Sequence, residues 1–118
     1  MKKDNPVLVK SYEFAKEIVL TYKQMIDEKE FVLSRQLVRS GTSIGANIEE
    51  AQGAQSQRDF IAKMQISLKE AKETHYWLRL LRDTQVLKRN PADQLIKNCN
   101  ELIYLLTAIL KKSKENLK

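Results

Sequence analysis

Few residues of this sequence could carry acid–base, nucleophilic or metal chemistry. It contains one histidine, His75, and one cysteine, Cys99. A di-iron site in a helical bundle needs Glu-x-x-His pairs on facing helices, and the residue three before His75 is Lys72. A lone cysteine offers neither an internal disulfide nor a zinc ligand set. The sequence therefore predicts no metal site and no cofactor.

His75 and Cys99 instead fall on the apolar faces of expected helices. We expect Cys99 to behave as a small hydrophobic residue and His75 to be a buried or edge histidine that makes one hydrogen bond. A Cys–His pair in space is conceivable, but no oxyanion hole or orienting third group accompanies it. Glu70 and Glu73 stand among lysines, which is typical of a solvated or interface-edge helix face. We expect a protein that is not an enzyme.

Length and composition favour a helical chain as the scaffold for these residues. A chain of 118 residues suits one domain. Three glycines and two prolines, against 31% charged residues, disfavour turn-rich β architectures. Apolar spacing predicts helices over about 7–27, 32–54, 57–87 and 91–114. We predict a single all-α domain, 1–118, folded as an antiparallel up-down-up-down four-helix bundle.

The first predicted helix carries two apolar stripes. The shorter stripe, Phe14, Ile18 and Met25, lies roughly 90–100° around the helix from the longer one. Because a bundle helix normally buries one arc, we assign the shorter stripe to a contact with another subunit, in a symmetric oligomer. We assign the longer stripe to the core; its members are Leu8, Tyr12, Ala15, Val19, Tyr22 and Ile26.

The third and fourth helices are marked by their starts and their apolar stripes. Ser56 followed by Asp59 resembles a capping box, and Asn90 before Pro91 is a natural N-cap for the fourth helix. The third helix again carries off-stripe apolar residues, Ile66, Trp77 and Leu81. Its main stripe contains Phe60, Met64, Leu68, Ala71, His75 and Leu78, and that of the fourth helix contains Leu95, Cys99, Leu102, Leu106, Ile109 and Ser113.

All three glycines lie in the segment RSGTSIGANIEEAQGAQ, residues 39–55. A glycine in a helix interior costs about 1 kcal/mol relative to alanine, so Gly41 and Gly45 need a steric reason. We expect a neighbouring helix or a large aromatic ring to approach the backbone there. Gly53 lies near the helix end, where glycine can terminate a helix in the left-handed conformation. The stretch SGTSIG lacks the lysine and the glycine spacing of a phosphate-binding loop.

Polar residues edge these glycines. If Ser40, Ser43 and Asn47 are buried, they must find hydrogen-bond partners in neighbouring turns or helices. We favour a polar clamp within the bundle over a binding site. The predicted structural motif consists of Gly41, Ser43, Gly45, Asn47 and Glu50.

The charge balance gives the main indication of a partner. The chain has 21 Lys and Arg against 15 Asp and Glu, a formal charge of +6. This excess favours anionic partners such as nucleic acid, although a surface that only keeps the protein soluble is the alternative. No apolar run has the length of a signal peptide or a membrane span, so we expect a cytoplasmic protein without a membrane partner. The candidate phosphate ligands are Arg35, Arg39, Lys69, Lys72, Arg79, Arg82, Lys88 and Arg89.

Two stretches carry a resemblance to a known family: SYEFAKEIVLTYKQM and LVRSGTSIGANIEEAQGAQSQRDFIAKMQISLKEAKETHYWLRLL. They resemble the four-helix bundle proteins named after the intervening sequences inserted in some bacterial 23S ribosomal RNA genes. The resemblance covers nearly the whole chain. Its most specific residues are Arg39, Ser43, Ile44, Asn47, Ile48 and Glu50, followed by Asp59, Phe60 and Glu70.

The resemblance implies a ring-like homopentamer of up-down bundles. The family is similar also to the accessory variability determinants of diversity-generating retroelements, which bind nucleic acid and cooperate with a reverse transcriptase. Many members place a glycine directly after the Asn-Ile-x-Glu segment, where this chain has Ala51. We expect a non-enzymatic homo-oligomer whose basic faces bind structured RNA or DNA. The alternative is a scaffold that docks a protein partner through the second apolar stripes and Trp77.

Overall fold

A computed structural model of the chain describes residues 5–117, and these form four α-helices packed against one another. No strand occurs within the described span, so the all-α, four-helix prediction is confirmed. Residues 1–4 and 118 of the predicted domain lie outside the described residues. The helices are α1 (Pro6–Asp27), α2 (Val32–Gln52), α3 (Gln57–Asp83) and α4 (Arg89–Asn116).

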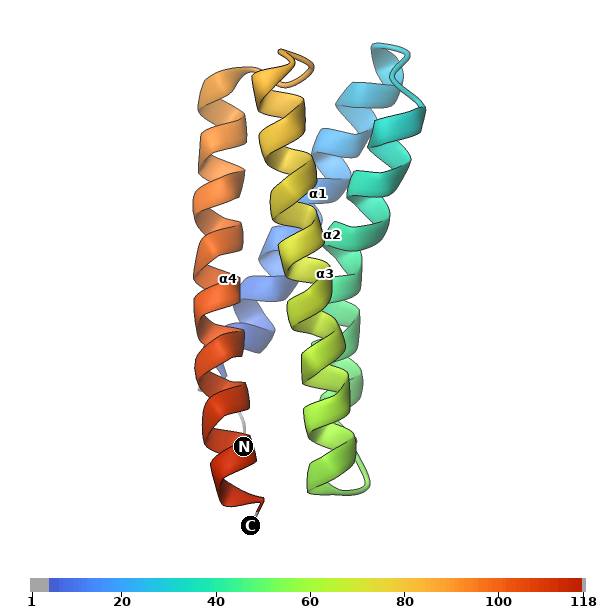
Figure 1. Cartoon of the computed structure of the whole chain (residues 1–118). Coiled ribbons are helices and arrows are strands. Elements are labelled where there is room, and N and C mark those ends of the chain that lie inside the picture. Colours follow the sequence, from blue (N-terminus) through green and yellow to red (C-terminus); the bar gives the residue numbers. More distant parts are fainter. Residues whose placement is uncertain (1–4, 118) are drawn as a thin grey trace.

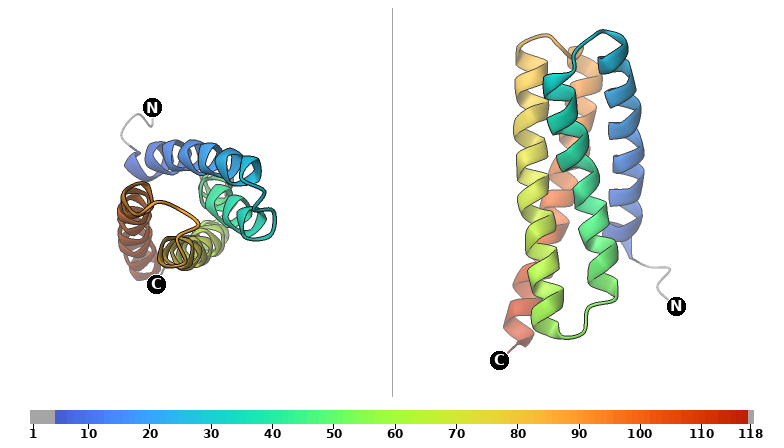
Figure 2. Two further views of the ribbon diagram at one scale, coloured as in Figure 1. Left: turned by 90° about the horizontal axis from the view of Figure 1, so that it is seen from above. Right: turned by 90° about the vertical axis from the view of Figure 1, so that its right-hand side faces the viewer.

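The helices surround one elongated core. α1 packs against α2, α2 against α3 and α3 against α4, and a less extensive contact between α4 and α1 completes the circuit. Figure 1 shows the α1–α2 and α3–α4 connections at one end and the α2–α3 connection at the other. The end-on view in Figure 2 shows all four helices around a common interior. The molecule measures 49 × 24 × 20 Å, so one layer of side chains from each helix fills the core.

The core face of α1 is the shorter of the two predicted stripes. Phe14, Ile18 and Met25 are buried, together with Val7 and Ser11. The longer stripe lies at the edge of this face: most of its residues are half-buried, and its Tyr12 is 60% exposed. The prediction was wrong because Ser11 interrupts the buried stripe, and counting apolar residues favoured the other face. The stripe that we assigned to a neighbouring subunit is therefore part of the chain's own core.

Two glycines bring α2 close to α1. A Cβ atom at Gly41 would lie 2.8 Å from Ile18 Cγ2, and one at Gly45 would lie 3.3 Å from the backbone oxygen of Ser11. The expected close approach is present, and the neighbour is a helix, not an aromatic ring. The apolar stripe of α2 is buried beside this contact, through Leu37, Ile44, Ile48 and Ala51.

α3 buries a wider arc than its main stripe predicts, because it packs against both α2 and α4. Leu81, which the sequence placed off the stripe, is fully buried. Ser67 and Thr74 are buried as well, whereas Phe60 and His75 are only half-buried. The polar members of this arc therefore need hydrogen-bond partners inside the bundle.

Side-chain caps set two of the helix starts. Asn5 Oδ1 accepts a hydrogen bond from the Leu8 backbone at 3.3 Å, directly before Pro6 begins α1. Ser56 Oγ accepts one from the Asp59 backbone at 3.0 Å, as the predicted capping box requires. Both caps satisfy N–H groups that have no partner within their own helix.

Three predicted helix ends differ from the structure. Gly53 follows α2 with φ −100°, outside the left-handed region in which we expected it. α3 stops before residue 87 because Gln85, with φ 66°, turns the chain. Lys88, not Asn90, is the N-cap of α4.

Candidate functional site

A polar network joins α2 to α3 on the outside of the bundle. Arg39 Nη1 lies 3.2 Å from Glu70 Oε1, and Arg39 Nη2 pairs with Glu73 Oε2. The same Glu73 oxygen accepts a hydrogen bond from Trp77 Nε1 at 3.1 Å. Arg39, a predicted phosphate ligand, is therefore engaged within the protein, and both carboxylates are drawn toward α2.

Beside this network lies a cationic stripe on the solvent side of α3, made of Lys69, Lys72, Tyr76 and Arg79; we call it the α3 stripe. The 3-4-3 spacing places the four residues within an arc of roughly 80° and over about 15 Å of helix. Among the described residues, no carboxylate forms an ion pair with its three cations. The stripe is thus an exposed surface with uncompensated positive charge.

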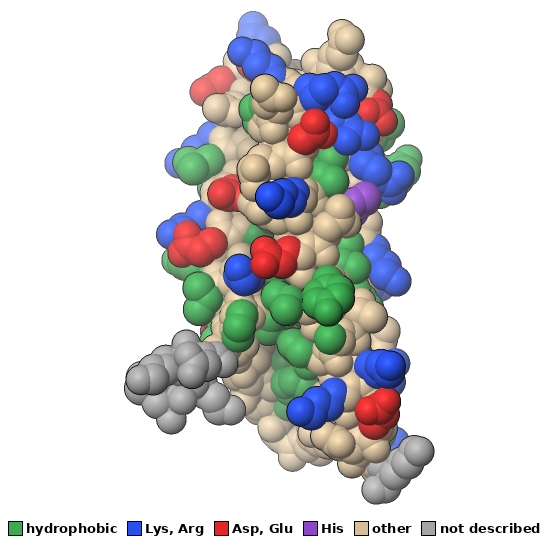
Figure 3. Space-filling model, turned by 90° about the vertical axis from the view of Figure 1, so that its left-hand side faces the viewer, with side chains coloured by type: hydrophobic (Ala, Val, Ile, Leu, Met, Phe, Trp, Pro, Cys, Tyr) green, Lys and Arg blue, Asp and Glu red, His purple; other side chains and the backbone are tan. Residues whose placement is uncertain are grey.

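His75 orients the last cation of the α3 stripe. Arg79 Nε donates a hydrogen bond to His75 Nδ1 at 3.0 Å, the single hydrogen bond that the sequence predicted for this histidine. Burial lowers the pKa of His75 below its usual value, and the charges of Arg79 and Arg82 lower it further. The neutral imidazole can therefore accept from Arg79 at neutral pH. In Figure 3, Lys and Arg side chains lie above and below the histidine.

The remaining candidate phosphate ligands divide by their surroundings. Arg82 is held by Asp83 at 2.8 Å and by Asp93 at 3.0 Å, which ties α3 to α4. Arg35 and Arg89 are exposed, on α2 and at the start of α4. The structure thus leaves Arg35 and Arg89 open to solvent and gives Arg82 acidic partners of its own.

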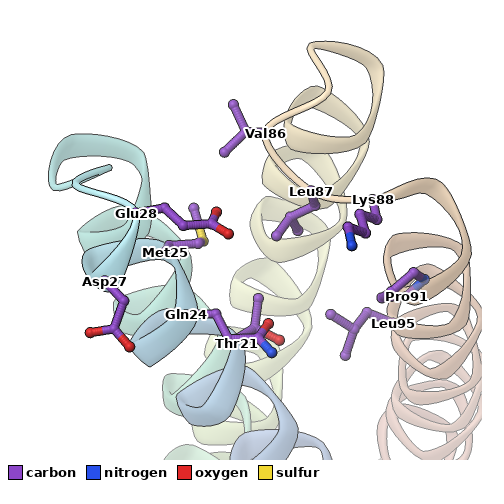
Figure 4. A pocket seen from close by; sticks show the side chains of 10 residues that line it. All are labelled: Thr21, Gln24, Met25, Asp27, Glu28, Val86, Leu87, Lys88, Pro91 and Leu95. Carbon is purple, nitrogen blue, oxygen red and sulfur yellow. The ribbon is translucent and has the colours of Figure 1, made fainter.

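Lys88 lines a cavity of about 450 Å³ between the end of α1 and the α3–α4 connection. Figure 4 shows Asp27 and Glu28 on the α1 side, and Lys88 on the opposite wall. Met25, Leu87 and Leu95 are among its apolar lining residues. Lys88 thus shares this cavity with two carboxylates on the opposite wall.

The Cys99 thiol is buried and stays protonated at neutral pH. Its Sγ donates to the Ala71 carbonyl oxygen at 3.2 Å, and burial raises its pKa to about 12. The hydrogen bond of Cys99 goes to Ala71 and that of His75 comes from Arg79, so the described residues contain no Cys–His hydrogen bond. Within residues 5–117, no three His, Cys, Asp or Glu side chains are placed to hold a metal ion. None of the helices in this range combines the length and apolar character that a membrane crossing requires.

Comparison with known proteins decides the family. A sequence model described as 23S rRNA-intervening sequence protein matches residues 3–108. The chain belongs to this family. It is also similar to a crystal structure of a protein of unknown function from the S23 ribosomal protein family of Bacteroides thetaiotaomicron. The two are 51% identical with a TM-score of 0.87, over 89% of this chain and 98% of the other. No curated protein matches the sequence.

In this member of the 23S rRNA-intervening sequence protein family, the polar residues beside the glycines find their hydrogen-bond partners in neighbouring turns and in α3. Ser43 Oγ and Asn47 Nδ2 both donate to carbonyl oxygens one turn earlier in α2, at 2.7 and 2.8 Å. Two bonds join this part of α2 to α3, and one of them involves Ser40. Ser67 Oγ donates to an α2 carbonyl at 2.8 Å, and the Ser40 and Thr74 hydroxyl oxygens lie 2.9 Å apart. The two glycines of the motif serve the packing of α2 against α1.

Glu50 and Tyr76 are exposed on the outer surfaces of α2 and α3. Glu50, the last residue of the predicted motif, lies 4.0 Å from Lys63 Nζ. Tyr76 was missed by the sequence analysis, although its spacing from Lys72 and Arg79 already placed it in the α3 stripe. Its ring is 50% exposed, and the guanidinium carbon of Arg79 lies 5.8 Å from the ring centroid.

Proposed function

We propose that this protein is a non-enzymatic, cytoplasmic nucleic-acid-binding protein that contacts phosphate groups through the α3 stripe. One observation carries the proposal: Lys69, Lys72 and Arg79 form no ion pair among the described residues, while Arg39 binds the neighbouring Glu70 and Glu73. Cations without a carboxylate partner are available to neutralise phosphates and release their counterions. The formal charge of +6 acts in the same direction.

The other basic residues take secondary roles in this proposal. Arg35 and Arg89, both exposed, extend the positive surface beyond the α3 stripe. Arg82 contributes less because it pairs with Asp83 and Asp93, and Lys88 contributes less because two carboxylates line the same cavity. Arg39 acts indirectly, by holding the carboxylates away from the lysines.

We also propose that the helices run antiparallel, up-down-up-down, and that the chain forms a homo-oligomer through the outer face of α1. Connections at alternate ends of the molecule support the topology. For the oligomer, the support is that Tyr12 and Leu20 are 60% and 61% exposed, and that Tyr12 lines a cavity of about 320 Å³ between α1 and α2. A pentamer is the assembly that the family resemblance implies. The second candidate, a scaffold for another protein, would use the same apolar face.

The proposal is tested by neutralising the α3 stripe against a matched control. The variant K69Q/K72Q/R79Q and the control K111Q/K112Q/K114Q lose the same charge, but the control residues lie near the end of α4. We expect the stripe variant to bind a structured RNA and a duplex DNA at least about tenfold more weakly than the wild type. The control variant should lose much less affinity for both nucleic acids. Equal losses in both variants, or no loss in either, would contradict a phosphate site on α3.

A further inference from the structure

We propose that Tyr76 is a stacking platform for an unpaired base, so that the α3 stripe binds single-stranded nucleic acid. This inference rests on the proposed function and adds the kind of nucleic acid and the residue that selects it. Lys72 and Arg79, one turn on either side of Tyr76, supply the phosphate contacts. The tyrosine ring supplies the contact with the base.

Two neighbours hold the Tyr76 ring in place. The Trp77 ring lies edge-on to it, with centroids 5.1 Å apart and an interplanar angle of 69°. The Arg79 guanidinium carbon lies 5.8 Å from the Tyr76 centroid. Trp77 and Arg79 are themselves fixed, by Glu73 Oε2 and by His75 Nδ1. A half-exposed aromatic ring supported in this way loses little conformational freedom when a base stacks on it.

A hollow at the other end of the α3 stripe extends the site. It has a volume of about 580 Å³, and Lys69 and Lys72 stand beside Ile66 and Leu68 in its lining. Ile66 is 46% exposed, so an apolar surface is available next to two cations. Lys69 and Tyr76 are separated by about 10 Å of helix, at about 1.5 Å per residue. A strand whose base stacks on Tyr76 can therefore place a second base in the hollow.

Base stacking on a convex helix surface favours a single strand over a duplex. Paired bases inside a duplex have both faces covered by their neighbours, whereas every base of a single strand offers a free π face to an aromatic side chain. A duplex would meet only the three cations of the stripe.

Trp77 provides a built-in probe for this contact. It is the one tryptophan of the chain, and its ring lies 5.1 Å from that of Tyr76. A base that stacks on Tyr76 therefore comes close enough to alter the fluorescence of Trp77. Phosphate contacts at Lys69 or Lys72 do not bring a base to this ring.

The experiment compares a 12-nucleotide single strand, an abasic strand with the same number of phosphates, and a 12-base-pair duplex, each titrated into the full chain. We expect the strand with bases to bind more tightly than the other two and to quench Trp77. Tyr76→Ala should weaken its binding roughly 5- to 100-fold, the range for loss of one stacked base. Tyr76→Phe and the control Tyr104→Ala, another exposed tyrosine, should bind like the wild type. Circular dichroism checks that each variant is folded.

The outcomes separate this inference from the proposed function. Equal binding of the abasic and normal strands, with no effect of Tyr76→Ala, would overturn the stacking platform while the phosphate site stands. Preference for the duplex would overturn it as well. If none of the three ligands binds the wild type at low salt, both the stacking platform and the nucleic-acid function fail.

Discussion

Gly41 and Gly45 determine how closely α1 and α2 pack. The space that a side chain would need at Gly41 is filled by Ile18, which is fully buried. At Gly45 the space for a side chain is limited by the Ser11 backbone, which cannot move independently of α1. The loss of helix propensity at these two glycines is thus offset by the burial of α1 against α2.

Gly41→Ala should destabilise the protein, because its Cβ would lie 2.8 Å from Ile18 Cγ2. Overpacking of this kind costs about 1–3 kcal/mol, and the gain in helix propensity returns at most ~1 kcal/mol. Gly53→Ala is the control, since the nearest atom to its Cβ is Glu50 O at 3.8 Å. Urea unfolding should show a loss for Gly41→Ala and no loss for Gly53→Ala. A Gly41→Ala protein as stable as the wild type would refute the close-packing explanation.

The raised pKa of Cys99 predicts that the protein loses stability at alkaline pH. Its pKa is about 12 in the folded protein, against an ordinary value of 9.0. The folded state therefore keeps the proton that the unfolded state releases, and stability present below pH 9.0 is lost between pH 9.0 and about 12. The free energy of unfolding should fall more steeply over this range in the wild type than in Cys99→Ala. Parallel curves for the two proteins would show that the thiol does not contribute.

The helices and most of their core faces were predictable, whereas the core face of α1 was not. Helix positions follow from apolar periodicity and from caps such as Ser56, which depend only on neighbouring residues. The core face of α1 depends on α2, because only the face with Ser11 and Ile18 fits against Gly41 and Gly45. A count of apolar side chains along one helix does not contain that information.

The candidate site also combines features that the local sequence predicts with features that depend on how α2 and α3 pack together. Composition and spacing predicted the basic residues of α3, but not which of them are free of carboxylates. The acids that bind Arg39 are 31 and 34 residues away in the chain. Their pairing depends on the register between α2 and α3, which local patterns do not define.

Removing Arg39 should affect both stability and binding. Arg39→Met leaves Glu70 and Glu73 without their cation, and partly buried ion pairs of this kind contribute about 1–2 kcal/mol. The freed carboxylates can then turn toward Lys69 and Lys72 and weaken nucleic-acid binding. A double-mutant cycle with Glu73→Gln should give a coupling energy of about 0.5–1.5 kcal/mol in urea unfolding. Additive effects would mean that the pair contributes nothing.

The whole molecule presents two surfaces that could each bind a partner. The α3 stripe is basic, and the outer face of α1 exposes Val9, Tyr12 and Leu20 among charged side chains. The two lie on helices that do not contact one another in the bundle. A chain built in this way can assemble through α1 while α3 stays open to a ligand, and symmetry would then repeat the cationic stripe around the oligomer.

The oligomer is tested by placing a charge on the outer face of α1. Leu20 is 61% exposed, and we expect Leu20→Glu to reduce the native mass to that of a monomer. Tyr104→Glu is the control, because Tyr104 is 73% exposed on α4. Its native mass should equal that of the wild type. A wild-type protein that is already monomeric at micromolar concentration would exclude assembly through this face.

The most direct test of the nucleic-acid function is the affinity of the wild-type protein for a single strand across a series of salt concentrations. Three phosphates bound by the α3 stripe predict a slope of log affinity against log salt of about −2, since each contributes roughly −0.7 for a single strand. An oligomer that engages several stripes would give a steeper slope. No binding at low salt, or an affinity that does not change with salt, would contradict the proposed function.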